Sequence, residues 1–162
     1  MADVLLDELD AARASFHAAL ADVDAPLATV PGVVGDWSVR DLVVHVAAWC
    51  EHAAAAIDLA VAGRGAEFGY SRDETDAMNE RILAEARATS PRHALAREEA
   101  AFTAFRERVA GVDAGLRAQR LGNGDTVEAV IGYDGPEHYA EHTEHLRAWF
   151  APDDHEDDED AD

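Results

Sequence analysis

Apolar side chains recur three and four residues apart along most of this chain, the spacing that places them on one face of an α-helix. The pattern predicts long helices over residues 3–23, 39–62, 72–89, 91–110 and 136–150, with a short turn at 127–132. Only 5 prolines and 11 glycines interrupt the 162 residues, too few for a many-turned β structure. Helices joined by such short links predict an all-α four-helix bundle with one short extra helical segment, a single domain over residues 1–150.

Polar residues mark where several of these helices begin. Ser38 and Ser71 each have an acidic residue three positions later, the arrangement that caps a helix N-terminus. Pro91 separates two helices, because proline suits a first turn and disrupts a helix interior. The residues expected to face inward include Leu42, Val46, Trp49, Ile57 and Val61 in one helix, and Leu95, Phe102, Phe105 and Val109 in another.

The charge of the chain is strongly negative. Its 13 basic residues, all of them arginine, stand against 34 acidic ones, for a net charge of -21. Such a charge repels phosphate backbones and anionic membrane surfaces, so neither nucleic acid nor a membrane is expected as a partner. Residues 151–162 are almost wholly acidic and are expected to form a disordered tail.

Cysteine usage and the N-terminal residues bear on the compartment. Cys50 is the only cysteine, which excludes an intrachain disulfide and a zinc site built from several thiolates. The first residues contain neither a basic segment nor an unbroken apolar run, so no export signal or membrane span is expected. Both observations favour a cytoplasmic protein. Cys50 lies among alanines, where a buried thiol is expected to be inert.

Three histidines near the C-terminus, His138, His142 and His145, lie at offsets of zero, four and seven. On a helix these offsets share one face, where a buried stripe normally carries leucine. His138 and His142 can present two nitrogens to one transition-metal ion, and a third ligand must come from elsewhere. His45 is a candidate because it lies on a buried stripe, although a lone histidine there is more often a core residue. The histidines that fall off the stripes, and are expected on solvated faces, are His17, His52 and His93.

Several other residues leave alternatives open. His145 is a hydrogen-bond partner of a ligand, an acid or base, or a solvent-facing residue. Glu51 and Glu141 are candidates to orient imidazoles, against the stronger expectation that they are surface glutamates. The residues that can line a cavity or belong to the core are Trp37, Asn79, Tyr133, Asp134 and Tyr139.

Two segments resemble a known superfamily. The first, Trp37-Ser-Val-Arg-Asp-Leu-Val-Val-His45-Val-Ala-Ala-Trp49, resembles the second helix of DinB-like proteins. This superfamily includes YfiT-type metalloenzymes, mycothiol-dependent maleylpyruvate isomerases and the ClbS/DfsB group. The second, His138-Tyr-Ala-Glu-His142 with the Glu before it and the later Leu-Arg-Ala-Trp, resembles the last helix, most closely that of the ClbS/DfsB branch.

The resemblance implies a four-helix bundle whose metal is held by one histidine of the second helix and a pair on the last. By position these ligands are His45, His138 and His142. Zinc or nickel suits imidazole ligands, and three neutral nitrogens leave room for water or substrate.

Two functions are compatible with these residues. The first is a metal-dependent enzyme similar to the thiol-dependent members of the superfamily, a transferase or hydrolase that acts on a small electrophilic molecule with a low-molecular-weight thiol. The second is a metal-free small-molecule binding or self-protection protein, as the ClbS/DfsB resemblance implies. A weaker third is an interaction module whose acidic surface recruits a basic partner. The relatives also imply a homodimer.

Overall fold

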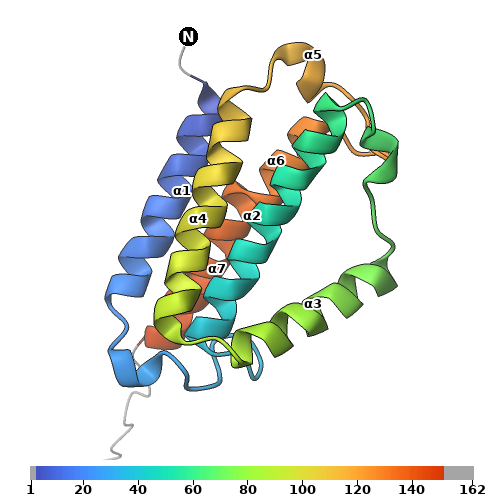
Figure 1. Cartoon of the computed structure of the whole chain (residues 1–162). Coiled ribbons are helices and arrows are strands. Elements are labelled where there is room, and N and C mark those ends of the chain that lie inside the picture. Colours follow the sequence, from blue (N-terminus) through green and yellow to red (C-terminus); the bar gives the residue numbers. More distant parts are fainter. Residues whose placement is uncertain (1–2, 152–162) are drawn as a thin grey trace, which may run out of the picture.

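The computed structural model describes residues 3–151, and these form an all-α bundle, as predicted (Figure 1). The helices are α1 (Val4–Ala21), α2 (Val39–Val61), α3 (Arg72–Arg87), α4 (Pro91–Ala110), α5 (Ala114–Arg117), α6 (Val127–Asp134) and α7 (Pro136–Phe150). Single turns of 3-10 helix lie at Ala25–Leu27 and Gly65–Glu67. These residues contain no β-strand, only two isolated bridges. The tail predicted for 151–162 lies outside the described residues except for Ala151.

Four long helices make up the bundle. α2 packs against α4 and α7 packs against α1, and further contacts join α1 to α4 and α2 to α7. α3 packs against α2 but runs away from the bundle axis, so it is the extra segment (Figure 1). The short turn predicted at 127–132 is instead α6, a helix of 8 residues that leads into α7. The 4-residue α5 was not predicted, because a single turn carries no apolar periodicity.

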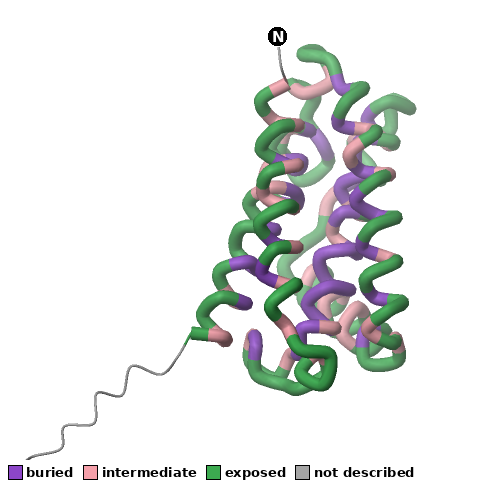
Figure 2. Tube along the Cα trace, turned by 90° about the vertical axis from the view of Figure 1, so that its left-hand side faces the viewer, coloured by how far each residue is buried: buried purple, intermediate pink, exposed green. Residues whose placement is uncertain are grey.

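The buried residues lie along the inner faces of the helices (Figure 2). α2 is long and apolar enough to cross a membrane by length and composition, yet 61% of its most apolar window is buried inside the bundle. Burial against neighbouring helices accounts for an apolar helix of this kind. Two residues predicted to face inward do not: Val61 at the end of α2 is 68% exposed, and Leu95 on α4 is 45% exposed. Leu95 faces a surface groove between α1, α2 and α4, where no helix covers it.

Both predicted capping boxes are present. The hydroxyl of Ser38 accepts a hydrogen bond from the backbone N–H of Asp41 at 3.3 Å, and the N–H of Ser38 donates to the Asp41 carboxylate at 2.9 Å. Ser71 and Glu74 pair in the same way at the start of α3. These caps satisfy backbone groups that the first turn leaves without partners, and they define where α2 and α3 begin.

A single glycine separates α6 from α7. Gly135 is buried, and a Cβ built on it would lie 2.5 Å from the carbonyl oxygen of Ile131 and 3.1 Å from the ring of Phe105. No side chain fits there, so the junction requires glycine. This junction places the last residue of α6, Asp134, one turn before His138 on α7.

A buried carboxylate connects three helices of the bundle. Glu98 of α4 has no exposed surface and accepts two hydrogen bonds from Arg13 of α1, both at 2.9 Å. His17 Nε2 lies 2.9 Å from the same carboxylate, and the Tyr139 hydroxyl of α7 donates to it. The His17 side chain is 37% exposed, so it does reach solvent as expected, but sequence periodicity does not reveal its buried partner on another helix.

Candidate metal centre

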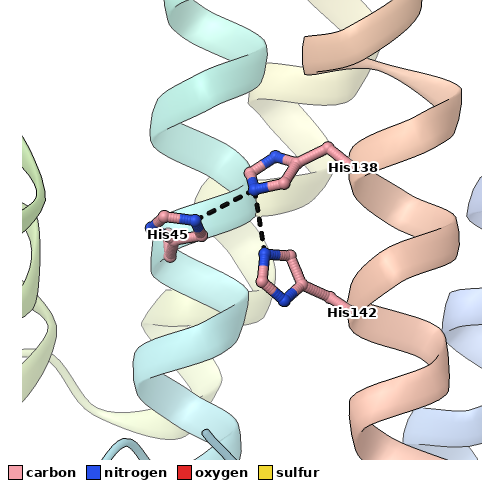
Figure 3. Close-up of side chains that lie close together, drawn as sticks. All are labelled: His45, His138 and His142. Carbon is pink, nitrogen blue, oxygen red and sulfur yellow. Dashed lines mark hydrogen bonds between the residues drawn. The ribbon is translucent and has the colours of Figure 1, made fainter. Parts of the chain in front are cut away.

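Three histidines from α2 and α7 converge in the interior of the bundle (Figure 3). His45 projects from α2, whereas His138 and His142 project from successive turns of α7. The Nε2 atom of His138 lies 2.9 Å from the Nε2 of His45 and 2.9 Å from the Nε2 of His142. The structure therefore brings the three predicted ligands together, and their ligation of a metal stays a prediction.

The two contacts of His138 Nε2 cannot both be full hydrogen bonds. A nitrogen of a neutral imidazole carries either one proton or one lone pair in the ring plane, so it makes one hydrogen bond. The Nε2 of His138 nevertheless faces two ring nitrogens at hydrogen-bonding distance. Either the two contacts share the single proton or lone pair of this nitrogen, or one contact has no proton, or two protons, between its nitrogens. A cation among the three nitrogens would satisfy every lone pair.

The size of the cluster suits a transition metal. The three donor nitrogens lie within 4.8 Å of one another. Two nitrogens bound to zinc at about 2.0–2.1 Å with tetrahedral angles lie about 3.4 Å apart. Small side-chain movements are enough to admit an ion.

Burial keeps these imidazoles neutral. His45 is 6% exposed and His142 is 5% exposed, and His138 is partly buried beside them. Burial, and next the neighbouring imidazoles, lower the pKa of each of the three to about 3. At neutral pH the rings therefore offer lone pairs, the form that binds a metal.

The outer nitrogens of the rings differ in their partners. Among the described residues, Nδ1 of His45 and Nδ1 of His138 are buried without a hydrogen-bond partner. Nδ1 of His142 lies 3.1 Å from Nδ1 of His145. Of the three roles left open for His145, the structure favours that of a hydrogen-bond partner to a candidate ligand.

The two glutamates considered as orienting groups do not reach the cluster. Glu51 accepts two hydrogen bonds from Arg97 on the surface, both at 2.9 Å. Glu141 is exposed on α7. The stronger expectation, that both are surface glutamates, is confirmed.

A cavity of about 350 Å³ opens beside His45 and His138. It lies between α2, α3, α6 and α7 and the loops that precede α3 and α6. The Nε1–H of Trp49 donates to the side-chain oxygen of Asn79 at 3.1 Å, and within residues 3–151 the Asn79 amide NH₂ has no acceptor, so it can donate to a bound molecule. The lining residues are His45, Trp49, His52, Phe68, Tyr70, Thr75, Asn79, Asn123, Tyr133, Asp134 and His138.

The residues named as possible cavity residues divide into two groups. Asn79, Tyr133 and Asp134 do line the cavity. Tyr139 has no exposed surface and belongs to the core, where it contacts Glu98. Trp37 packs its ring against the imidazole of His45, with the ring centroids 4.8 Å apart, and so supports that side chain.

His52 is a site residue that the sequence reasoning missed. It was predicted on a solvated face, but its ring lies 4.7 Å from that of Tyr70 and its Nε2 is buried without a partner among the described residues. Burial lowers its pKa. The available signal was spacing: His45, Trp49 and His52 repeat the offsets of zero, four and seven found on α7. Of the three histidines predicted to lie on solvated faces, His93 is exposed as predicted.

Cys50 lies in the core rather than in the cavity. It is fully buried, and its thiol donates to the Tyr139 hydroxyl at 3.6 Å. Burial raises the pKa of the thiol to about 12, so it is protonated at neutral pH. The burial on which the expectation of an inert thiol rests is confirmed.

Comparisons with known proteins agree with this architecture. The fold is similar to that in a crystal structure of an uncharacterised protein from Escherichia coli UTI89, with a TM-score of 0.76 and 18% identity over 90% of each chain. No curated protein matches the sequence. Residues 9–147 match the family described as mycothiol maleylpyruvate isomerase N-terminal domain. The chain therefore belongs to this family, within the DinB-like superfamily.

Proposed function

We propose that this protein is a metal-dependent enzyme in which His45, His138 and His142 bind a divalent transition metal, zinc or nickel. The observation that carries the proposal is the contact of one ring nitrogen of His138 with two others at 2.9 Å, which hydrogen bonding alone does not satisfy. All three rings are neutral and belong to two rigid helices, as a preformed site requires. Three protein ligands leave a further position for substrate, as in catalytic rather than structural sites.

The reaction we propose is the addition of a low-molecular-weight thiol to a small electrophilic molecule, or the hydrolysis of such a molecule. The family is described by its mycothiol-dependent isomerase, which supports a thiol substrate. A metal bound here would lower the pKa of a coordinated thiol or water. The cavity of about 350 Å³ lies at the lower end of small-molecule sites, so it suits a small substrate.

The residues of this chain supply binding and exclusion of water. The rings of Trp49, Phe68 and Tyr70 cover the cavity beside the histidines, and the free NH₂ of Asn79 is a donor for a carbonyl or another acceptor on the substrate. We further propose that the protein acts in the cytoplasm, forms a homodimer and belongs to the ClbS/DfsB branch, as the two sequence segments suggest.

Metal analysis of protein purified without a histidine tag tests the site. We expect about one equivalent of zinc or nickel per chain after incubation with either ion and removal of the excess. The His142→Ala variant should lose this metal and the thermal stabilisation that comes with it. A metal that binds only the folded state raises the free energy of unfolding by about 2.7 kcal/mol when the free metal concentration is 100 times Kd.

His93→Ala is the matched control, because His93 is exposed on α4, away from the cluster. It should bind metal as the unaltered protein does. Negligible metal in the unaltered protein under all conditions would overturn the proposal and favour the metal-free binding protein. Equal loss of metal in both variants would show that binding is not specific to the cluster.

A further inference from the structure

Asp134 is a buried acid without a partner. It is the last residue of α6, it is 7% exposed, and it lines the cavity that contains His45 and His138. Within residues 3–151, no hydrogen bond or ion pair reaches its carboxyl group. Two other buried acids of this bundle have partners by contrast: Glu98 has three side-chain partners, and Asp41 pairs with Ser38 and Arg40. A buried carboxyl group normally has such partners, so this one is free to act on a molecule in the cavity.

Asp134 is also the sole acid among the lining residues of this cavity. Burial raises the pKa of its carboxyl group to about 8, so its carboxylate is a much stronger base than that of an ordinary aspartate. A cation bound by the neighbouring histidines would favour the ionised form of Asp134, which is the form able to accept a proton. The other titratable side chains that line the cavity are His45 and His52 from α2, Tyr70 before α3, Tyr133 from α6 and His138 from α7.

The position of this carboxyl group is imposed by the fold. Gly135 follows it, and the close approach of Gly135 to Ile131 and Phe105 leaves no room for another residue. The junction therefore holds Asp134 and His138 on the wall of the same cavity although they belong to different helices.

We propose that Asp134 is the proton acceptor of this cavity, and that its carboxylate takes the proton of a thiol bound beside the three histidines. The S–H bond breaks, an O–H bond forms on a carboxylate oxygen of Asp134, and the sulfur keeps the electron pair as a thiolate. The thiolate then attacks the electrophile, and the carboxylic acid can return the proton to the product. This inference rests on the proposed function, since it needs a thiol in the cavity.

Proton release on thiol binding tests the inference without a known substrate. The probe is 2-mercaptoethanol, added to cobalt(II)-loaded protein in weakly buffered solution at about pH 7. Cobalt absorption follows binding, and a pH indicator follows released protons. The unaltered protein should release almost no proton per thiol bound, because Asp134 keeps it. The Asp134→Asn variant should release about one.

Two further variants sharpen the result. Asp134→Glu keeps an acid at this position and should again retain the proton, which a merely structural role would not predict. Asp36→Asn is the matched control, because Asp36 is an exposed acid paired with Arg87. It should behave as the unaltered protein does. If Asp134→Asn does not fold, release of about one proton per thiol by the unaltered or the Asp134→Glu protein still overturns the inference.

The outcomes separate this inference from the function on which it rests. Release of about one proton per thiol by the unaltered protein would overturn the role of Asp134 while metal and thiol binding stand. Equal release by the unaltered protein and Asp134→Asn would do the same. If the unaltered protein binds neither cobalt nor thiol, the proposed function itself fails, and the inference fails with it.

Discussion

Glu98 and Asp134 are both removed from water, but only Glu98 has hydrogen-bond donors around it. Burial alone would raise the pKa of Glu98, yet hydrogen bonds from His17, Arg13 and Tyr139 outweigh burial and lower it to about 2. Asp134 has no such donors among the described residues, and burial raises its pKa to about 8. At the residue scale, the carboxylate of Glu98 therefore stabilises the fold, whereas the carboxyl group of Asp134 is available for reaction.

Glu98→Gln should destabilise the protein by about 3 kcal/mol at pH 7, because it leaves the partly buried Arg13 without its counter-charge. Urea denaturation measures this difference. The folded pKa of about 2 lies below the unfolded value, so the ionic contribution is complete above about pH 4.5 and is lost as the pH falls towards 2. The difference between the two proteins should therefore be smaller at pH 3.

Asp10→Asn is the control for this change. Asp10 accepts hydrogen bonds from Arg106 on the surface, and both side chains are about two-fifths exposed, at 39% and 41%. Exposed pairs contribute less than about 1 kcal/mol. A loss as large as that of Glu98→Gln would contradict the importance we assign to burial.

Asp134→Asn should make the metal-free protein more stable at high pH. The folded pKa of about 8 lies above the ordinary value of 3.8, so the protonated acid favours folding below about pH 4 and this contribution is lost as the pH rises through 8. Relative to the variant, the unaltered protein should lose a few kcal/mol between pH 5 and pH 8.5. Urea denaturation across this range, with a chelator present, measures it, and parallel curves would contradict the prediction.

At the scale of elements, the cavity depends on how α6 meets α7. A continuous helix through residues 127–150 would place Asp134 and His138 on one regular face. The break at Gly135 instead allows α6 to pack against α2 while α7 packs against α1. One glycine thus aligns two elements that both contribute to the cavity.

Gly135→Ala should destabilise the protein by about 3 kcal/mol, because the added methyl group would lie 2.5 Å from the Ile131 carbonyl oxygen. Thermal or urea denaturation measures this cost, and metal content should fall as the junction shifts. Gly111→Ala is the control: it also changes a glycine at a helix end, but its Cβ would meet nothing closer than 3.5 Å. Equal effects of the two changes would contradict the steric argument.

At the scale of the whole molecule, the excess of negative charge is the dominant electrostatic feature. Several arginines pair with acids on neighbouring helices, for example Arg97 with Glu51 and Arg108 with Asp58. With 13 arginines and 34 acids, however, most acids have no arginine to pair with. Repulsion among them opposes the compact state.

Added salt should therefore raise the melting temperature. Raising NaCl from about 0.01 M to 1 M shortens the screening length from about 30 Å to 3 Å, which weakens repulsion across the whole surface. Differential scanning calorimetry measures the shift. A chain ending at Ala151 lacks eight acidic residues and should show a smaller rise. A fall in melting temperature with salt would mean that the surface ion pairs outweigh the repulsion.

Periodicity within a helix predicted the long helices and the buried positions of His45 and Phe105, and a serine followed three residues later by an acid predicted the caps of α2 and α3. It also placed His138 and His142 on one face of α7, and resemblance to a superfamily supplied His45 as the third member of the cluster. Each of these features depends on residues a few positions apart. Local spacing determines which side chains share a face.

Only the tertiary structure decided what each face meets. Leu95 continues an apolar stripe but faces an open groove, and His52, expected on a solvated face, packs against Phe68 and Tyr70 beside the cavity. Glu98 and Asp134 look like ordinary acids in the sequence, and their opposite pKa shifts come from the presence or absence of donors on other helices. The sequence alone thus determined the helices and most of their inward faces. The environment of each titratable group depended on distant segments, because burial and hydrogen bonding are properties of the packed bundle.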